Sequence, residues 1–185
     1  LDHGAIGKTL FAMSAPAIAG MVVMAVYNIA DTFFVSLLRD TTAVAATGIV
    51  FPLFQLIGAV GLTFGMGAAS VISRRLGAKD QDAANEAAST ALYSAFVVGI
   101  ALAVTGAIFI QPVLRLFGAT ESILAEATLY GRVIIGGSIF QVLNMTINNI
   151  LRSEGASLHS SMGQMSGAVL NIILDPIFIL VLNMG

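Results

Sequence analysis

The chain has 185 residues, of which 57% are hydrophobic and only 10% are charged, and its mean hydropathy is +0.94. A soluble domain is about 25% charged, so this chain has too few polar side chains to cover a globule of its size in water. The net charge of −2 argues against nucleic acid as a partner, because binding it would require a basic face. The lack of cysteine excludes a disulfide framework and a thiolate metal site. The composition therefore predicts an integral membrane protein with the lipid bilayer as its main partner.

Uncharged stretches between charged residues mark the membrane spans. Five such stretches contain about 19 to 33 residues each, and about 20 residues cross a bilayer core as a helix. Each stretch is too long for a strand, and in lipid the backbone hydrogen bonds must close within the segment, which favours helices over a barrel. The sequence predicts an all-α fold in one transmembrane domain covering residues 1–185. Its five helices are expected near residues 9–38, 43–73, 84–110, 123–151 and 157–183.

Short polar connectors separate the predicted helices, and Gly77 in the second connector is placed to end a helix. Five lysine and arginine side chains fall on one side of the membrane and three on the other, which predicts a cytoplasmic N-terminus. The connectors are expected at residues 39–42, 74–82, 111–121 and 152–155.

Two acidic residues, Asp31 and Asp175, fall inside predicted spans rather than at their ends. Each lies about eight residues from the end of its span, hence about 12 Å along the helix. Four reversals of direction separate the first span from the fifth, so both carboxylates are expected in the outer half of the membrane. An aspartate at membrane depth costs about 2.5–3.5 kcal/mol and usually faces a bundle interior or an ion pathway. We therefore expect both acids to line such a pathway.

Oxygen-bearing side chains accompany both acids. Asn171 precedes Asp175 by one helical turn, Tyr27 precedes Asp31 by one turn, and Asn28 lies three residues before Asp31. Carboxylate, amide and phenol oxygens are the ligands that hard cations prefer. Without a cation, two nearby carboxylates in low dielectric repel each other, which favours protonation of one of them. The pattern predicts a proton-binding or Na⁺-binding site formed by Asp31, Asn171, Asp175 and Tyr27.

Structural interpretations of the same residues stay open. Asp31 could pair with an arginine at the membrane interface, Asp175 could be a hydrogen-bonded acid beside Pro176, and Asn171 could join helices by packing. Pro16 removes a backbone hydrogen bond to Ala12 and so permits a helix bend. Three asparagines, Asn28, Asn144 and Asn148, are expected to line a cavity. Three glycines, Gly61, Gly65 and Gly67, are expected to allow close helix packing.

Five segments along the chain match the pattern of a known family. They read YNIADTFFV at 27–35, GMGAAS at 65–70, RRLG at 74–77, LRSEG at 151–155 and LNIILDPIF at 170–178. Together these segments resemble the multidrug and toxic compound extrusion (MATE) family, in its prokaryotic branch.

The resemblance implies an antiporter of twelve helices in two six-helix lobes. This chain would supply about five helices of the N-terminal lobe and would stop before the sixth helix and the second lobe. The cation site of that lobe would map onto Asp31, Asp175, Asn171 and Tyr27, and a proton-controlled bend of the first helix would map onto Pro16.

The expected function is a secondary multidrug exporter in the inner cell membrane. It would exchange amphipathic, often cationic compounds for H⁺ or Na⁺ by alternating access, with no other cofactor and with the second lobe as its partner. No metalloprotease or nucleophile-elbow motif is present, so an enzyme is not expected. Two alternatives remain: a lipid-linked oligosaccharide flippase of the same superfamily, against which the acidic intramembrane charges count, and a non-transporting half-module that needs a partner.

Overall fold

A computed structural model describes residues 41–177 and, before them, residues 7, 11, 14–15, 18–27, 29–30 and 33; the side chains of Thr41, Ala43 and Asp175 are outside the description. The chain divides into two compact units. Unit 1 comprises residues 1–39 with 155–185, and unit 2 comprises residues 40–154. Every regular element among the described residues is a helix, which confirms the predicted all-α class.

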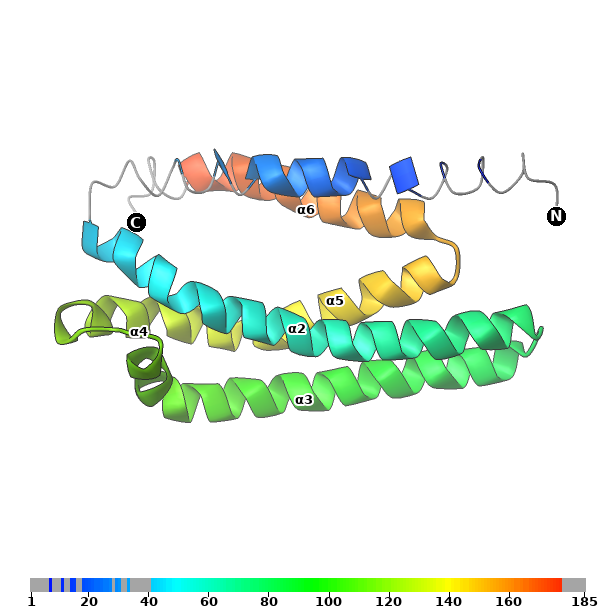
Figure 1. Cartoon of the computed structure of the whole chain (residues 1–185), viewed down its shortest axis with the longest axis horizontal. Coiled ribbons are helices and arrows are strands. Elements are labelled where there is room, and N and C mark those ends of the chain that lie inside the picture. The colour runs from blue at the N-terminus through cyan, green and yellow to red at the C-terminus, as the bar shows by residue number, and fades with distance from the viewer. Residues whose placement is uncertain are drawn as a thin grey trace. The chain divides into compact units, whose positions relative to one another are not determined.

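Unit 2 consists of four helices, with the antiparallel pair α2 and α3 as its longest members (Figure 1). Helix α5 packs against both α2 and α3, and α4 covers the other end of the same pair. Two of the described helices, α2 and α3, are long and apolar enough to cross a membrane, and α4 with α5 can count as one bent span. The helices are α2 (Thr41–Gly77), α3 (Gln81–Leu116), α4 (Glu121–Gly136) and α5 (Ser138–Ser153).

The turn between α2 and α3 is closed by local polar contacts. Helix α2 ends at Gly77 as predicted, but the left-handed backbone conformation falls on Lys79, with φ 60°. Asp80 caps α3 by accepting a hydrogen bond from the Ala83 amide at 3.2 Å, and its carboxylate lies 3.5 Å from the Arg75 guanidinium. Capping side chains of this kind satisfy the free amides at a helix start.

Two expectations about unit 2 are wrong. The predicted single helix at 123–151 is two helices, because the chain bends by 47° at Gly137. The predicted connector at 111–121 is shorter, because α3 continues through Pro112 to Leu116 with a local kink at Phe109. A proline inside a helix removes one hydrogen bond and kinks the helix without ending it when the neighbouring helices hold it in place.

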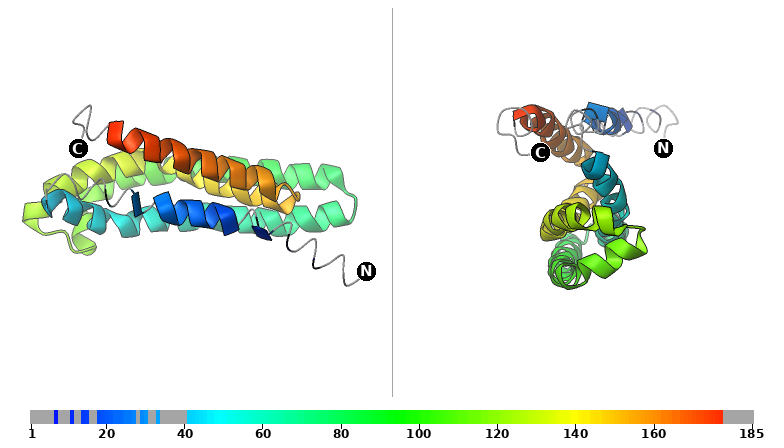
Figure 2. Two further views of the ribbon diagram at one scale, coloured as in Figure 1. Left: turned by 90° about the horizontal axis from the view of Figure 1, so that it is seen from above. Right: turned by 90° about the vertical axis from the view of Figure 1, so that its left-hand side faces the viewer.

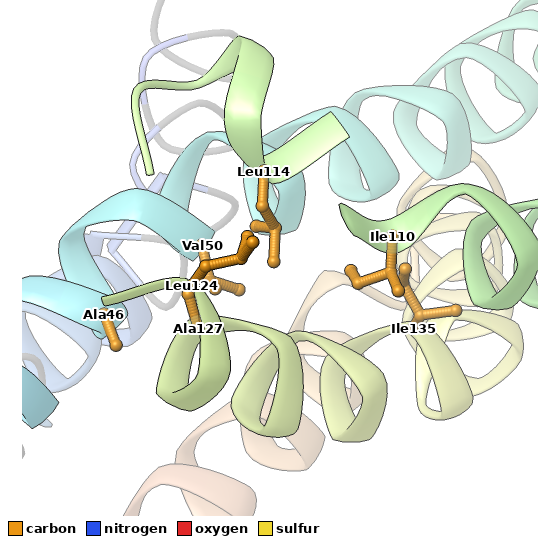
Figure 3. Packing of buried hydrophobic residues seen from close by; sticks show 7 residues of the cluster. All are labelled: Ala46, Val50, Ile110, Leu114, Leu124, Ala127 and Ile135. Atoms are coloured by element: carbon orange, nitrogen blue, oxygen red, sulfur yellow. The ribbon is translucent and has the colours of Figure 1, made fainter. Parts of the chain in front are cut away.

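The buried apolar side chains of unit 2 form separate clusters along its length. The end cluster joins α2, α3 and α4 (Figure 3), whereas the other two clusters join α2, α3 and α5. The end cluster contains Ala46, Val50, Ile110, Leu114, Leu124, Ala127 and Ile135; the other two contain Ile57, Ala95 and Val142, and Ala68, Ile72, Ala84 and Ile150.

Small residues allow α2 to approach α5 closely. A Cβ atom on Gly61 would lie 2.9 Å from Val142 Cα, and one on Gly65 would lie 2.9 Å from Asn149 Cβ. The expected packing role is therefore confirmed for these two glycines. It is wrong for Gly67, which has no such neighbour within 4 Å.

Unit 1 contains the helical stretch Ile18–Tyr27 and α6 (Ser157–Pro176). The two helices lie side by side and run in the same direction (Figures 1 and 2). This confirms the parallel direction expected for the first and fifth predicted helices.

Candidate cation site

One face of α6 carries the residues that point to a site. Ser161 and Ala168 are buried and Gln164 and Asn171 are half-buried, whereas Met162, Val169, Leu170 and Ile173 are exposed. The sheltered positions recur every three or four residues, so they form a single stripe along the helix. Position 175 continues this stripe, one turn after Asn171.

The first helix contacts this stripe through Gly20. A Cβ atom on Gly20 would lie 3.8 Å from the amide oxygen of Gln164 and 3.9 Å from Ser161 Cβ, which is ordinary van der Waals contact. Gly20 is buried, and the less exposed positions that follow it on the same face include Val23 and Tyr27. The half-buried side of the first helix therefore faces the stripe on α6.

The parallel arrangement fixes which residues are level with each other. Tyr27 lies seven residues after Gly20, and Ala168 and Asn171 lie seven residues after Ser161 and Gln164. Since parallel α-helices rise equally per residue, Tyr27 lies level with the turn that contains Asn171. The structure thus brings to one level two of the four residues predicted to bind a cation.

Of the two predicted acids, the structure describes only the backbone of Asp175. Asp175 lies in the last turn of α6, one helical turn after Asn171, as its spacing predicted, and its side chain is outside the description. Asp31, Asn28 and Pro16 lie outside the described residues. Among the side chains that the structure does describe, no three His, Asp or Glu residues are grouped as a metal site would need. Asp31 and the side chain of Asp175 lie outside the described part of the chain.

The asparagines expected to line a cavity lie on α5 in unit 2. Asn148 is buried and donates its amide to the Asn144 main-chain oxygen at 2.8 Å and to the Asn144 side-chain oxygen at 3.0 Å. Asn144 is exposed. These hydrogen bonds hold both side chains against their own helix, and a cavity-lining role stays a prediction.

A groove that the sequence did not indicate runs between α2 and α3. Its volume is about 500 Å³. Gly67 is one of the small residues that line it, in agreement with the open space around the Cβ position of this glycine. Arg75 and Glu86 line it together with Thr63, Phe64, Ala68, Val71, Ala83, Ala87, Thr90, Ala91 and Ser94. The alanine repeat at the start of α3 is the signal that could have predicted it.

The MatE family model matches residues 16–177, nearly the whole chain. The chain belongs to the MatE family. The curated relatives include the multidrug export protein MepA of Staphylococcus aureus, which is 30% identical over 178 residues. The MepA of Staphylococcus saprophyticus is 28% identical over the same length.

Solved MATE structures share the fold. A MATE transporter in the straight conformation gives a TM-score of 0.90 at 36% identity and covers 96% of this chain, and one in the bent conformation gives 0.88 at 36%. A MOP superfamily transporter from Pyrococcus furiosus, described as having a binding pocket of reversed polarity, gives 0.89 at 36% identity. The resemblance to the MATE family drawn from the five sequence segments is therefore confirmed.

The MatE chain spans about 40% of the length of these relatives. The alignment with MepA includes 96% of this chain, so nearly all of the chain corresponds to one part of the longer transporter.

Proposed function

We propose that this chain is the N-terminal lobe of a secondary multidrug exporter that couples the outward movement of amphipathic, often cationic compounds to the entry of H⁺ or Na⁺. A second lobe would complete the transporter in the inner cell membrane. Its relatives named as multidrug export proteins support export as the activity.

The parallel packing of the first helix on α6 carries the coupling part of the proposal. Gly20 contacts the stripe of α6 at Ser161 and Gln164, and the same register puts Tyr27 level with Asn171. One turn further on, the sequence has Asp31 on the first helix and Asp175 on α6. Two carboxylates, one amide and one phenol would then surround a single site for a cation.

The acids would supply the energy difference that drives the cycle. A ligand shifts a conformational equilibrium only by its differential affinity for the two states. Binding of a proton or Na⁺ would relieve the repulsion between Asp31 and Asp175, and a cationic substrate would compete with that ion for the same negative charge. Bending of the first helix near Pro16 would then accompany the switch between the two states.

Dye efflux from proteoliposomes tests the proposal. The full-length transporter would be reconstituted and energised first by a proton gradient and then by a sodium gradient. Wild-type protein should drive efflux under one gradient, and Asp175→Asn should abolish that efflux while leaving the amount of inserted protein unchanged. Undiminished efflux in Asp175→Asn would reject the coupling role of the acid.

A control on α6 separates a site effect from a packing effect. Ser166→Ala changes an exposed hydroxyl that bonds only within α6, to Gly163 O at 3.0 Å, and should leave efflux at the wild-type rate. If neither gradient drives efflux in wild-type protein, the result would favour the two alternatives, a flippase or a half-module that does not transport. Transfer of a labelled lipid-linked oligosaccharide across the same membrane would then distinguish these two.

A further inference from the structure

Three helix irregularities occur in unit 2. Helix α3 leaves helical geometry at Phe109, with φ −104° and ψ 17°, three residues before Pro112. The chain bends by 47° at the glycine pair between α4 and α5. Helix α2 contains Pro52, which cannot donate a hydrogen bond to the carbonyl four residues earlier.

These irregularities lie near one level of the unit. Ile135, next to the glycine pair, packs where a Cβ on Gly106 would be, and Gly106 lies three residues before Phe109. On the other side of the pair, Gln141 donates its amide to the Phe54 carbonyl at 3.1 Å, two residues after Pro52. The irregularities of α2, of α3 and of the α4–α5 pair are thus neighbours in space.

The apolar core divides at the same level. The end cluster shown in Figure 3 takes its residues from α2 before Pro52, from α3 after Phe109 and from α4 before the glycine pair. The other two clusters take theirs from the opposite sides of these points. Leu53 and Ile134 pack against clusters on both sides and so mark the boundary.

The two glycines at the break make no close contact with the other described helices of unit 2. A Cβ on Gly136 would meet nothing within 4 Å, and one on Gly137 would approach only carbonyls of its own helix, at 3.5 Å or more. Neither has a positive φ. Two adjacent glycines give the backbone at the break more freedom than other residues would.

The two sides of the break are attached differently. Helix α5 is fixed to its neighbours by side chains that donate to main-chain carbonyls: Ser138 to Gly99 at 3.4 Å and Thr146 to Gly61 at 3.3 Å. Helix α4 packs on α2 and α3 through the apolar end cluster, and the Arg115–Glu121 ion pair, 3.0 Å long, ties it to the part of α3 that follows Phe109. Apolar contacts are non-directional and can move together, whereas hydrogen bonds to the backbone fix a register.

We propose that the end of unit 2 moves as one body about a hinge formed by Pro52, Phe109 and the glycine pair Gly136–Gly137. Its role as a moving part in the export cycle rests on the proposed function; the hinge itself rests on the packing of unit 2. We call the moving part the distal segment (residues 41–51, 110–116 and 121–135) and the fixed part the proximal segment (residues 53–77, 81–108 and 138–153).

Distances between spin labels test the hinge. The chain has no cysteine of its own, so within it labels attach only at introduced cysteines, and any cysteine in the rest of the transporter would be replaced by serine. Val97 on α3 and Leu129 on α4 are 62% and 66% exposed and lie on opposite sides of the hinge. In the full-length transporter in nanodiscs, this pair should show two distance populations whose ratio changes with pH, Na⁺ or a cationic dye. Met66 and Val97, both in the proximal segment, should show one unchanged population.

Stiffening the glycine pair provides the decisive variant. Alanine fits at Gly136 and Gly137 without a clash, so the double variant Gly136→Ala/Gly137→Ala should fold. It should reduce the fraction of molecules that show the less populated distance by about fivefold or more. Gly67→Ala makes the same chemical change at an equally open site away from the hinge and should leave both populations as in wild type. A single Val97–Leu129 distance in every condition, or an unchanged ratio in the double variant, would overturn the hinge. Since these distances are measured without transport, failure of the Asp175→Asn prediction would leave the hinge intact.

Discussion

The hydroxyl of Thr146 on α5 donates a hydrogen bond to the main-chain carbonyl of Gly61 on α2, 3.3 Å away, and both residues are buried. The single hydroxyl proton is shared with the Val142 carbonyl of its own helix, which lies closer, at 2.8 Å. This contact is possible only because Gly61 lacks a side chain, so that the backbones of α2 and α5 meet. In a membrane, where water cannot satisfy the backbone, small residues and interhelical hydrogen bonds of this kind hold helices together.

Replacing Gly61 should weaken unit 2 measurably. The Cβ of Gly61→Ala would lie 2.9 Å from Val142 Cα and from Met145 Cβ, and backbone atoms cannot move away cheaply. We expect a loss of about 1–3 kcal/mol, typical of an overpacked core, seen as a lower unfolding temperature in detergent. Gly67→Ala, which meets nothing within 4 Å, should instead be neutral or stabilise by up to about 1 kcal/mol. Equal unfolding temperatures for the two variants would contradict the close contact.

Removing the Thr146 hydroxyl should have a smaller effect. Thr146→Val keeps the shape of the side chain and deletes the donor to Gly61, so the expected loss is about 0.6–1 kcal/mol, the usual size of an interhelical hydrogen bond in a membrane. Thr105→Val is the matched control, because the Thr105 hydroxyl is exposed and bonds within its own helix, to Ala101. Thermal unfolding of both variants beside wild type measures the difference. A control that loses as much as Thr146→Val would assign the effect to helix propensity.

The turn between α2 and α3 should gain stability from glycine at position 79. Lys79 has φ 60°, a left-handed conformation that costs a non-glycine residue about 1–2 kcal/mol. Lys79→Gly removes this cost but adds backbone entropy to the unfolded chain, so a net gain of up to about 1 kcal/mol is expected. Lys79→Ala also removes the charge but keeps the strained backbone, and should show no gain. A gain of the same size in both variants would attribute the effect to charge.

Asn171 should determine how strongly the transporter responds to its coupling ion. The proposal places its amide oxygen beside the acids, so Asn171→Ala should raise the ion concentration needed for half-maximal efflux by about tenfold or more, as expected for a lost polar contact to a charged group. Tyr27→Phe should shift the same quantity in the same direction, since it removes only a phenol oxygen. Half-maximal concentrations equal to that of Ser166→Ala would indicate that neither residue is a ligand.

The sequence was sufficient to predict where most helices of unit 2 lie, because charges and apolar stretches alternate there. It placed the second and third helices at 43–73 and 84–110, whereas α2 and α3 extend over Thr41–Gly77 and Gln81–Leu116. The charged residues Arg74 and Asp82 fall in the predicted connector, but both are helical in the structure. A charge ends the part of a helix that can lie in lipid, and the helix itself continues as long as its backbone bonds are satisfied.

The break between α4 and α5 could not be predicted from hydropathy. Residues 133–151 are uncharged, so they read as one span, and glycines are common in straight membrane helices as well. The bend depends on the tertiary contacts around Gly136 and Gly137. Ile135 packs against Gly106 on one side of the pair, while Ser138 bonds to the Gly99 carbonyl on the other.

Sequence spacing predicts which residues of the candidate site share a face of one helix. It does not predict which residues of two different helices lie level with each other. The one-turn separation of Asn171 and Asp175 follows directly from helical geometry. The level of Tyr27 beside Asn171 depends on where the first helix meets α6, and that position is set by Gly20 against Ser161 and Gln164. No pattern in the sequence had singled out that contact.

Helices α2 and α3 have 37 and 36 residues, and at about 1.5 Å per residue each measures about 55 Å. The hydrocarbon core of a bilayer is about 30 Å thick and about 40–45 Å with its headgroup regions, so an upright hairpin of this length would extend beyond the bilayer by about 10 Å. Three exposed residues at this end of the hairpin offer trypsin sites: Arg74 and Arg75 in the last turn of α2, and Lys79 in the connector. The turn is therefore a natural reporter of sidedness: a protease added to sealed vesicles can cut there from one side of the membrane only, and the fragment it releases identifies which side that is.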